Sequence, residues 1–254
     1  MSTDEDGGDV AEATPVAALR DPAPEHNEVL RRLPHEEYDR LRPHFEVVSL
    51  VSMQVINEPG SEIENVYFPQ DAVISYVTML QGSAGVEAHT VGRDGMAGFC
   101  LINGVSNSTA QMICQIPGEA KRMSAAAFRD ILPECPDLTA RLRRYAQLVM
   151  ELVSQSAACN RMHVTEERCA RWLLMSHDRT GRDRFHLTQG FLAQMLGVRR
   201  PGVTVAIGML EKAGFISHQR GVIAVLDRDG LERSSCECYD VIRRREIELI
   251  GMHS

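Results

Sequence analysis

The chain has 254 residues, of which 44% are hydrophobic, enough to build two domain cores. Its formal net charge of −8 is uneven: the first 28 residues carry eight acids and one arginine, whereas residues 164–230 carry ten Arg and Lys against seven Asp and Glu. No apolar run approaches the about eighteen residues of a membrane span, and no signal peptide is recognisable, so we expect a cytoplasmic protein without membrane contact.

The N-terminal half predicts many short strands. Residues 1–25 are rich in acids, Ala, Gly and Pro and predict a disordered acidic leader. Two short helices follow at 27–33 and 34–42. Runs rich in Val, Ile and aromatic residues, separated by turn signals, then predict strands at 45–51, 54–57, 65–68, 72–80, 85–91, 110–116 and 120–123. This spacing indicates a small sandwich or barrel.

A long helix is predicted over residues 135–163, after a shorter helix that Ser124 caps. Its apolar positions follow a four-three spacing, which predicts a parallel dimer seam: Leu138, Leu142, Tyr145, Val149, Leu152 and Cys159. The alternative is an ordinary long helix packed on its own domain. Cys159 is either a small buried residue or, if it meets its mate across the dimer, a thiol switch. The helix stops near His163, where the chain has a joint, and Thr165 is predicted to cap a new helix.

Residues 187–216 predict a helix-turn-helix. Thr188 caps a helix that Gly197 ends, and Arg200 with Pro201 begins a second helix with a buried stripe of Val203, Ile207 and Leu210. Alternating residues at 215–217 and 222–226 then predict a β-hairpin wing with Arg220 at its tip. Double-stranded DNA is the expected partner, contacted by a set of hydroxyl, amide, imidazole and guanidinium groups: Thr188, Gln189, Arg199, Arg200, Thr204, His218 and Arg220.

This order of elements resembles the Crp/Fnr superfamily of bacterial transcription regulators, most specifically in LTQ..LAQMLGVRR..V......L...G.I at 187–216. The resemblance implies an α+β fold with a β-roll or jelly-roll sensor domain (26–134), a dimerisation helix (135–163) and a winged helix-turn-helix domain with a C-terminal helix (164–254). It gives Arg200 the family's base-reading role. Pro201 and Val205 stand where better-known members carry a Glu and an Arg. The operator sequences of those members are therefore not expected for this chain.

The sensor domain departs from the cyclic-nucleotide binders of this family. Met96 stands where they carry an acid, and no charged residue lies between Asp94 and Glu119. A phosphate buried there would lack a cation, so we expect weak or no cyclic-AMP binding and no cofactor. The remaining ligand-pocket candidates, which suit a neutral effector, are Gly95, Met96, Ser108 and Thr109.

Metal, haem and enzyme chemistry find little support in the sequence. The seven cysteines are scattered, and none precedes Cys100, which argues against an iron-sulfur cluster of the Fnr kind. Cys236 and Cys238 would point apart on a helix, so no metal site is predicted. His89 and His163 stay open as haem ligands. No phosphate loop or nucleophile elbow occurs, so we expect no enzyme.

The sequence therefore predicts a dimeric DNA-binding transcription regulator that reads an inverted repeat with the helix at 200–213. RNA polymerase is a possible further partner. The alternative is a small-molecule-binding module or a thiol-based redox sensor without a cyclic-AMP response. We expect the C-terminal residues 231–250 to form one more helix, whose arginines Arg243, Arg244 and Arg245 face water or DNA.

Overall fold

The computed structural model describes residues 25–81 and 85–251, so nearly all of the predicted acidic leader lies outside the described residues. Two short helices begin the described chain, α1 (Glu28–Arg31) and α2 (His35–Leu41). Asn27 caps α1 through its side chain and donates its amide to the carbonyls of Pro69 and Gly95. These bonds attach the first helix to the β-domain.

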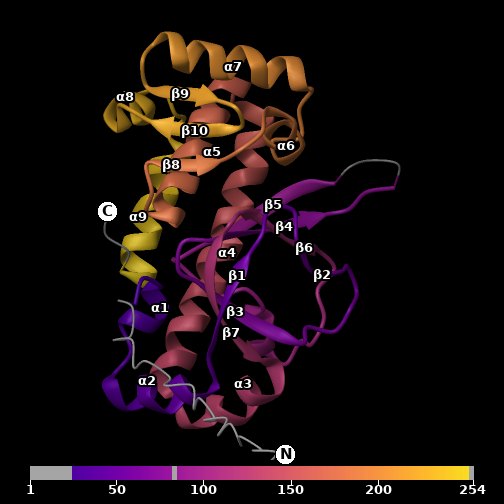
Figure 1. Ribbon diagram of the computed structural model, residues 1–254, viewed down its shortest axis with the longest axis vertical. Helices are drawn as coiled ribbons and strands as arrows, with labels where there is room; N and C mark the ends of the chain where they lie inside the picture. The colour runs from indigo at the N-terminus through magenta and orange to yellow at the C-terminus, as the bar shows by residue number, and fades with distance from the viewer. Residues whose placement is uncertain (1–24, 82–84, 252–254) are drawn as a thin grey trace, which may run out of the picture.

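The β-domain consists of two antiparallel sheets (Figure 1). One has the order β1-β7-β3 and the other the order β2-β6-β4-β5. All seven predicted strands are confirmed to within two residues at either end: β1 (Glu46–Leu50), β2 (Val55–Asn57), β3 (Asn65–Pro69), β4 (Val73–Thr78), β5 (Val86–Val91), β6 (Gln111–Ile116) and β7 (Gly118–Ser124). Aromatic and β-branched residues such as Phe68, Val66 and Ile74 fill the core between the sheets.

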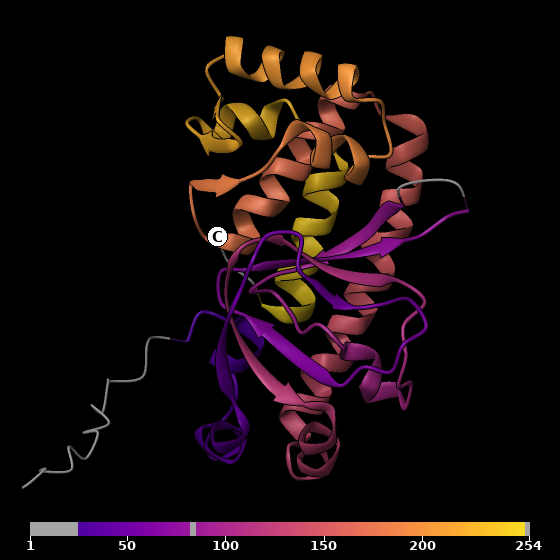
Figure 2. The same ribbon diagram turned by 45° about the vertical axis from the view of Figure 1, so that its right-hand side comes forward.

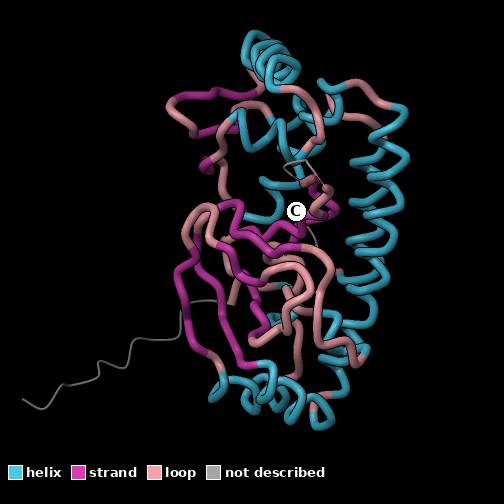
Figure 3. The backbone as a smooth tube through the Cα atoms, turned by 90° about the vertical axis from the view of Figure 1, so that its right-hand side faces the viewer, coloured by secondary structure: helices cyan, strands magenta, loops and turns pink. Residues whose placement is uncertain are grey.

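Two helices close the N-terminal half. Ser124 accepts a hydrogen bond from the Ala127 amide and so caps α3 (Ala125–Ile131), as predicted. The long helix α4 (Pro136–Met162) then runs along one edge of the molecule (Figure 3). Short 3-10 turns lie at η1 (Arg42–His44), η2 (Phe99–Asn103) and η3 (Leu132–Glu134).

The predicted dimer seam is wrong, because this face of α4 is buried within the chain. Four of the six seam residues belong to one hydrophobic core with the β-domain: Leu138, Leu142, Tyr145 and Val149. Leu152 is also buried and lines a pocket together with Glu87 and Trp172. Cys159 is fully buried against Cys236 of the same chain. A four-three spacing marks a buried stripe equally well whether the covering surface comes from a second chain or from the same one.

The C-terminal half contains a three-stranded antiparallel sheet and four helices before the last one. The elements are α5 (Thr165–Thr180), β8 (Arg184–His186), α6 (Gln189–Met195), α7 (Arg200–Lys212), β9 (Ile216–Gln219), β10 (Val222–Val225) and α8 (Arg228–Arg233). The sheet order is β8-β10-β9. The joint after α4 is confirmed, but Thr165 is the first residue of α5 and not its cap.

The predicted single helix at 231–250 is instead two helices, since the chain turns at residues 234–237 between α8 and α9 (Cys238–Ile250). Figure 2 shows α9 descending from the helix-turn-helix region toward the β-domain. It packs along α4, and its last residue, Ile250, joins the core of the β-domain. Arg243 is 12% exposed and pairs with Glu246, so the expectation that it faces water or DNA is wrong, whereas Arg245 pairs with Glu151 at the surface.

The architecture is therefore α+β, with a β-roll, a long helix and a winged helix-turn-helix in chain order. Among the described residues, no helix combines the length and hydropathy that crossing a bilayer requires.

Candidate nucleic-acid interface

The helix-turn-helix consists of α6 and α7, and its turn forms as the sequence predicts. Thr188 caps α6 by accepting a hydrogen bond from the Phe191 amide, and Gly197 takes the left-handed conformation with φ of 63°. Four apolar side chains of α7 are buried, the three predicted ones and Ala206: Val203, Ala206, Ile207 and Leu210. The opposite side of α7, including Thr204 and Val205, faces solvent at one end of the molecule (Figure 1).

Three of the predicted DNA contacts meet in a polar cluster at the exposed side of the helix-turn-helix. Thr204 Oγ1 donates to Gln189 Oε1 at 2.8 Å, and Gln189 Nε2 lies 3.4 Å from His218 Nδ1. These side chains come from α7, α6 and β9. The cluster therefore fixes the orientation of an amide and a hydroxyl group, both suited to base edges or phosphates.

Three predicted DNA-contacting arginines are exposed, and within the described residues none of them forms an ion pair. Arg199 and Arg200 stand at the N-terminus of α7, where the helix dipole also favours an anion. By contrast, Arg228 and Arg245 are paired with carboxylates. Guanidinium groups without a protein partner gain most from a phosphate or a guanine edge.

The wing is a tight hairpin of β9 and β10. Arg220 and Gly221 form its turn with φ of 50° and 76°, the two positive values of a type I′ turn. The carbonyl of Gly221 accepts a hydrogen bond from the Leu187 amide, which holds the wing against the start of α6. Sequence reasoning missed β8, whose three residues are too few to show an alternating pattern.

None of the four ligand-pocket candidates lines the cavity that lies beside β2 and β3 of the β-domain. Met96 is fully buried in the core, and Gly95 packs against the Tyr145 ring, where no Cβ fits. Ser108 and Thr109 lie in the loop before β6. The lining of that cavity includes three carboxylates, from Glu58, Glu62 and Glu64. An acidic lining is unfavourable for a phosphate.

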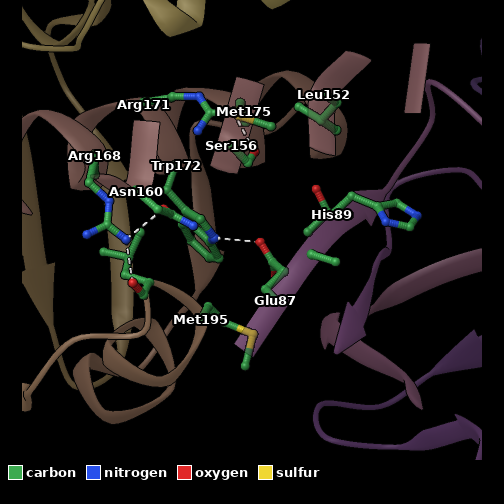
Figure 4. Close-up of a pocket in the computed structure, with 13 residues that line it drawn as sticks. Glu87, His89, Leu152, Ser156, Asn160, Arg168, Arg171, Trp172, Met175 and Met195 are labelled. Carbon is green, nitrogen blue, oxygen red and sulfur yellow. Dashed lines mark hydrogen bonds between the residues drawn. The ribbon is translucent and has the colours of Figure 1, made fainter. Parts of the chain in front are cut away.

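The β-domain contacts the helix-turn-helix through β5. Figure 4 shows Trp172 of α5 pointing toward Glu87 of β5, with its Nε1 donating to Glu87 Oε1 at 3.0 Å. Ser75 Oγ donates to the other carboxylate oxygen at 2.8 Å. Burial raises the pKa of Glu87 to about 7. Hydrophobic side chains of β4 and β6, among them Val77 and Ile113, share a core with α5 and α6, so the two domains pack directly on one another.

His89, one of the two candidate haem ligands, lies next to this contact. Its ring stacks on Tyr76 with centroids 4.3 Å apart. Burial lowers the pKa of His89 to about 3, so the ring is neutral at physiological pH. The stacking gives His89 a packing role.

A buried ionic triad joins three parts of the chain. Arg179 of α5 lies 3.2 Å from Asp94, which follows β5, and 3.4 Å from Glu246 of α9. All three side chains are at most 4% exposed. Sequence reasoning missed this triad, since its members are 67 or more positions apart and belong to no motif.

The cysteines gather where the sequence analysis predicts no site. Cys236 lies before α9 and Cys238 is its first residue, so they are not opposed on a helix, and that argument against a shared site is wrong. Both lie beside Cys159 and His163 of the α4 terminus. The hydrogen bond from Cys236 lowers the pKa of the Cys159 thiol below its usual range.

The family comparison places a Crp-like helix-turn-helix domain at residues 167–234. No curated protein matches the chain in a sequence search. Solved structures of similar fold include FixK2 from Bradyrhizobium japonicum, with a TM-score of 0.63, 13% identity, and coverage of 76% of this chain and 98% of that one.

Two further solved structures have a similar fold. The c-di-GMP responsive regulator CLP from Xanthomonas campestris has a TM-score of 0.58 and 12% identity, covering 76% and 99% of the two chains. A Crp-family regulator from Thermus thermophilus has a TM-score of 0.58 and 17% identity, covering 74% and 96%. The described chain thus has the fold of Crp/Fnr transcription regulators. Residues 167–234 therefore form a Crp-like helix-turn-helix domain within a chain of this fold.

Proposed function

We propose that the chain is a homodimeric transcription regulator that reads an inverted-repeat operator and performs no enzymatic chemistry. The observation that carries the proposal is a group of three exposed arginines beside the hydrogen-bonded cluster. Among the described residues, none of them forms an ion pair: Arg199, Arg200 and Arg220. In this proposal Arg200 and Thr204 contact bases. Thr188, Arg199 and Arg220 hold phosphates.

The dimer surface is the exposed side of α4. It carries a second four-three stripe that the sequence analysis missed beside the stronger buried one: Ala146, Met150, Val153 and Ala157. Met150 is 67% exposed and Val153 38% exposed, unusual for apolar side chains in the middle of a long helix. Small residues beside them permit two helices to approach closely. We therefore assign the seam to this stripe.

Replacing Met150 with glutamate tests the seam. The variant loses the apolar contact and places two like charges across the two-fold axis. We therefore expect the free energy of dimer dissociation to fall by about 3–6 kcal/mol, counting about 1.5–3 kcal/mol for each chain. Sedimentation equilibrium measures the dimer constant. Val47→Glu, at a residue 62% exposed on β1, is the matched control and leaves the constant unchanged. A Met150→Glu protein that dimerises like the wild type contradicts this seam.

The β-domain senses an effector other than cyclic AMP in this proposal. A cyclic phosphate would meet the carboxylates of Glu58, Glu62 and Glu64 in the cavity, whereas the only ion-paired cation beside them among the described residues is Arg129, on Glu62. Titration calorimetry with cyclic AMP is expected to show no micromolar binding. A signal received by the β-domain would reach the reading helices through the contact of Glu87 with Trp172 and through the joint after α4.

Operator selection tests the function. Genomic fragments retained by the protein in a gel shift are expected to share an inverted repeat. Its half-sites are centred about 34 Å apart, because the two recognition helices of a dimer enter successive major grooves. Retention of fragments with no shared sequence would contradict specific regulation. It would leave only non-specific binding through the basic surface.

A further inference from the structure

Four side chains that suit a soft metal ion meet where α4 ends and α9 begins. Cys159 and His163 are one helical turn apart, and Cys236 and Cys238 flank one residue at the start of α9. Their ligand atoms all lie within 4.8 Å of one another. The three cysteines are buried and form a small cluster of their own, separate from the two main cores.

The distances fit a tetrahedral ion. Cys159 Sγ lies 3.5 Å from Cys236 Sγ, and Cys238 Sγ lies 3.5 Å from His163 Nδ1. A tetrahedral zinc ion with sulfur at about 2.3 Å and nitrogen at about 2.0 Å separates its ligand atoms by about 3.5–3.8 Å. The four atoms therefore need to move little to surround such an ion.

We propose that Cys159, His163, Cys236 and Cys238 bind one zinc ion in a closed, structural Cys₃His site. Three sulfur ligands and one imidazole select a thiolate-preferring metal over magnesium or calcium. Because all four positions are taken by the protein, the ion has no open position for a substrate. The proposal does not depend on DNA binding.

The surroundings of His163 resemble the outer shell of known zinc sites. Nδ1 faces the sulfur cluster, and Nε2 lies 3.1 Å from Glu237 Oε2. A carboxylate on the remote ring nitrogen holds the other nitrogen free to bind the metal and makes it more basic. Gln155 adds a hydrogen bond from its amide to Cys238 Sγ at 3.0 Å, which orients that sulfur.

The charge of the loaded site is also compensated. Zinc with three thiolates and a neutral imidazole carries one net negative charge. Two guanidinium groups of α5, from Arg168 and Arg171, are buried and interact electrostatically with Cys159. They are held to the same part of α4 by hydrogen bonds to Asn160 and Ser156. A buried anionic site requires such cations.

The site lies at the joint between the two domains. His163 directly follows α4 and stands two residues before α5, which leads into the helix-turn-helix. A bound ion would link this joint to the start of α9 and so fix the position of α5 relative to α4.

Metal analysis of the full-length chain tests the proposal. Protein purified under reducing conditions from zinc-supplemented cells is expected to contain about one zinc per chain by mass spectrometry. Cys236→Ser should lower the zinc content to near zero. Cys135→Ser is the matched control, because Cys135 is also buried but lies at the opposite end of α4. Cobalt added to metal-free protein should give thiolate charge-transfer bands and tetrahedral d–d bands.

A milder variant keeps the test decisive if the cysteine variants do not fold. Glu237 is 74% exposed, so Glu237→Gln leaves the fold intact while weakening zinc binding by about 10–100-fold in a chelator competition. Asp240→Asn, also exposed on α9, is its control and keeps full affinity. Three results would overturn the proposal: reduced wild-type protein that takes up neither zinc nor cobalt, zinc retained in Cys236→Ser, or a Cys159–Cys236 disulfide in place of metal.

Discussion

The Arg200→Ala variant is expected to lose about 1–3 kcal/mol of binding free energy at each half-site, and therefore about 2–6 kcal/mol for a dimer on its operator. Arg200 is the first residue of α7, exposed and without an ion pair among the described residues, so its guanidinium is available to a guanine edge. Gel shifts on the selected operator and on a scrambled fragment of equal length measure the change. The scrambled fragment should bind almost as before.

Arg199→Ala provides the matched control at the adjacent position. Arg199 precedes α7 and is equally exposed, but we expect it to hold a phosphate. Its loss should weaken binding to both fragments alike. The slope of log affinity against log salt concentration should fall by about one for each lost phosphate contact. If Arg200→Ala instead weakens both fragments equally, Arg200 holds a phosphate and the base-reading assignment is wrong.

The Arg179→Met variant is expected to lose about 3–5 kcal/mol of unfolding free energy near neutral pH, because it leaves Asp94 and Glu246 buried without their cation. Burial raises the pKa of Glu246. Arg179 opposes this shift, and the resulting pKa is about 7. A carboxyl with a raised pKa in the folded state costs stability as pH rises from its unfolded value toward the folded one. Without Arg179 this loss extends to higher pH, so the defect should be larger at pH 8 than at pH 5.5.

Urea unfolding followed by the fluorescence of Trp172, the only tryptophan, measures both effects. Arg233→Met is the surface control, since Arg233 is 71% exposed and lies 4.0 Å from Asp227; it should change stability by less than about 1 kcal/mol. Adding Asp94→Asn and Glu246→Gln to Arg179→Met should restore part of the loss, because neutral partners need no cation. Wild-type stability of Arg179→Met at pH 8 would contradict the role of the triad.

Local patterns were sufficient for most of the secondary structure. The strands of the β-domain follow from alternating apolar residues between turn signals, and the caps at Asn27, Ser124 and Thr188 form because a side-chain oxygen lies next to free amides. The helix-turn-helix was predictable for the same reason. Its turn depends on Gly197, and its buried stripe depends on helical spacing within α7.

Residue patterns were therefore enough to predict the order of the elements, the winged helix-turn-helix and the arginines beside it. The face of α4 that is covered depends on tertiary packing, because periodicity marks a buried stripe without identifying the surface that buries it. Tertiary packing also forms the ionic triad of Arg179 and the contact of Cys159 with Cys236, 77 positions away. Contacts across such separations depend on how whole elements pack, and no local pattern of residues encodes them.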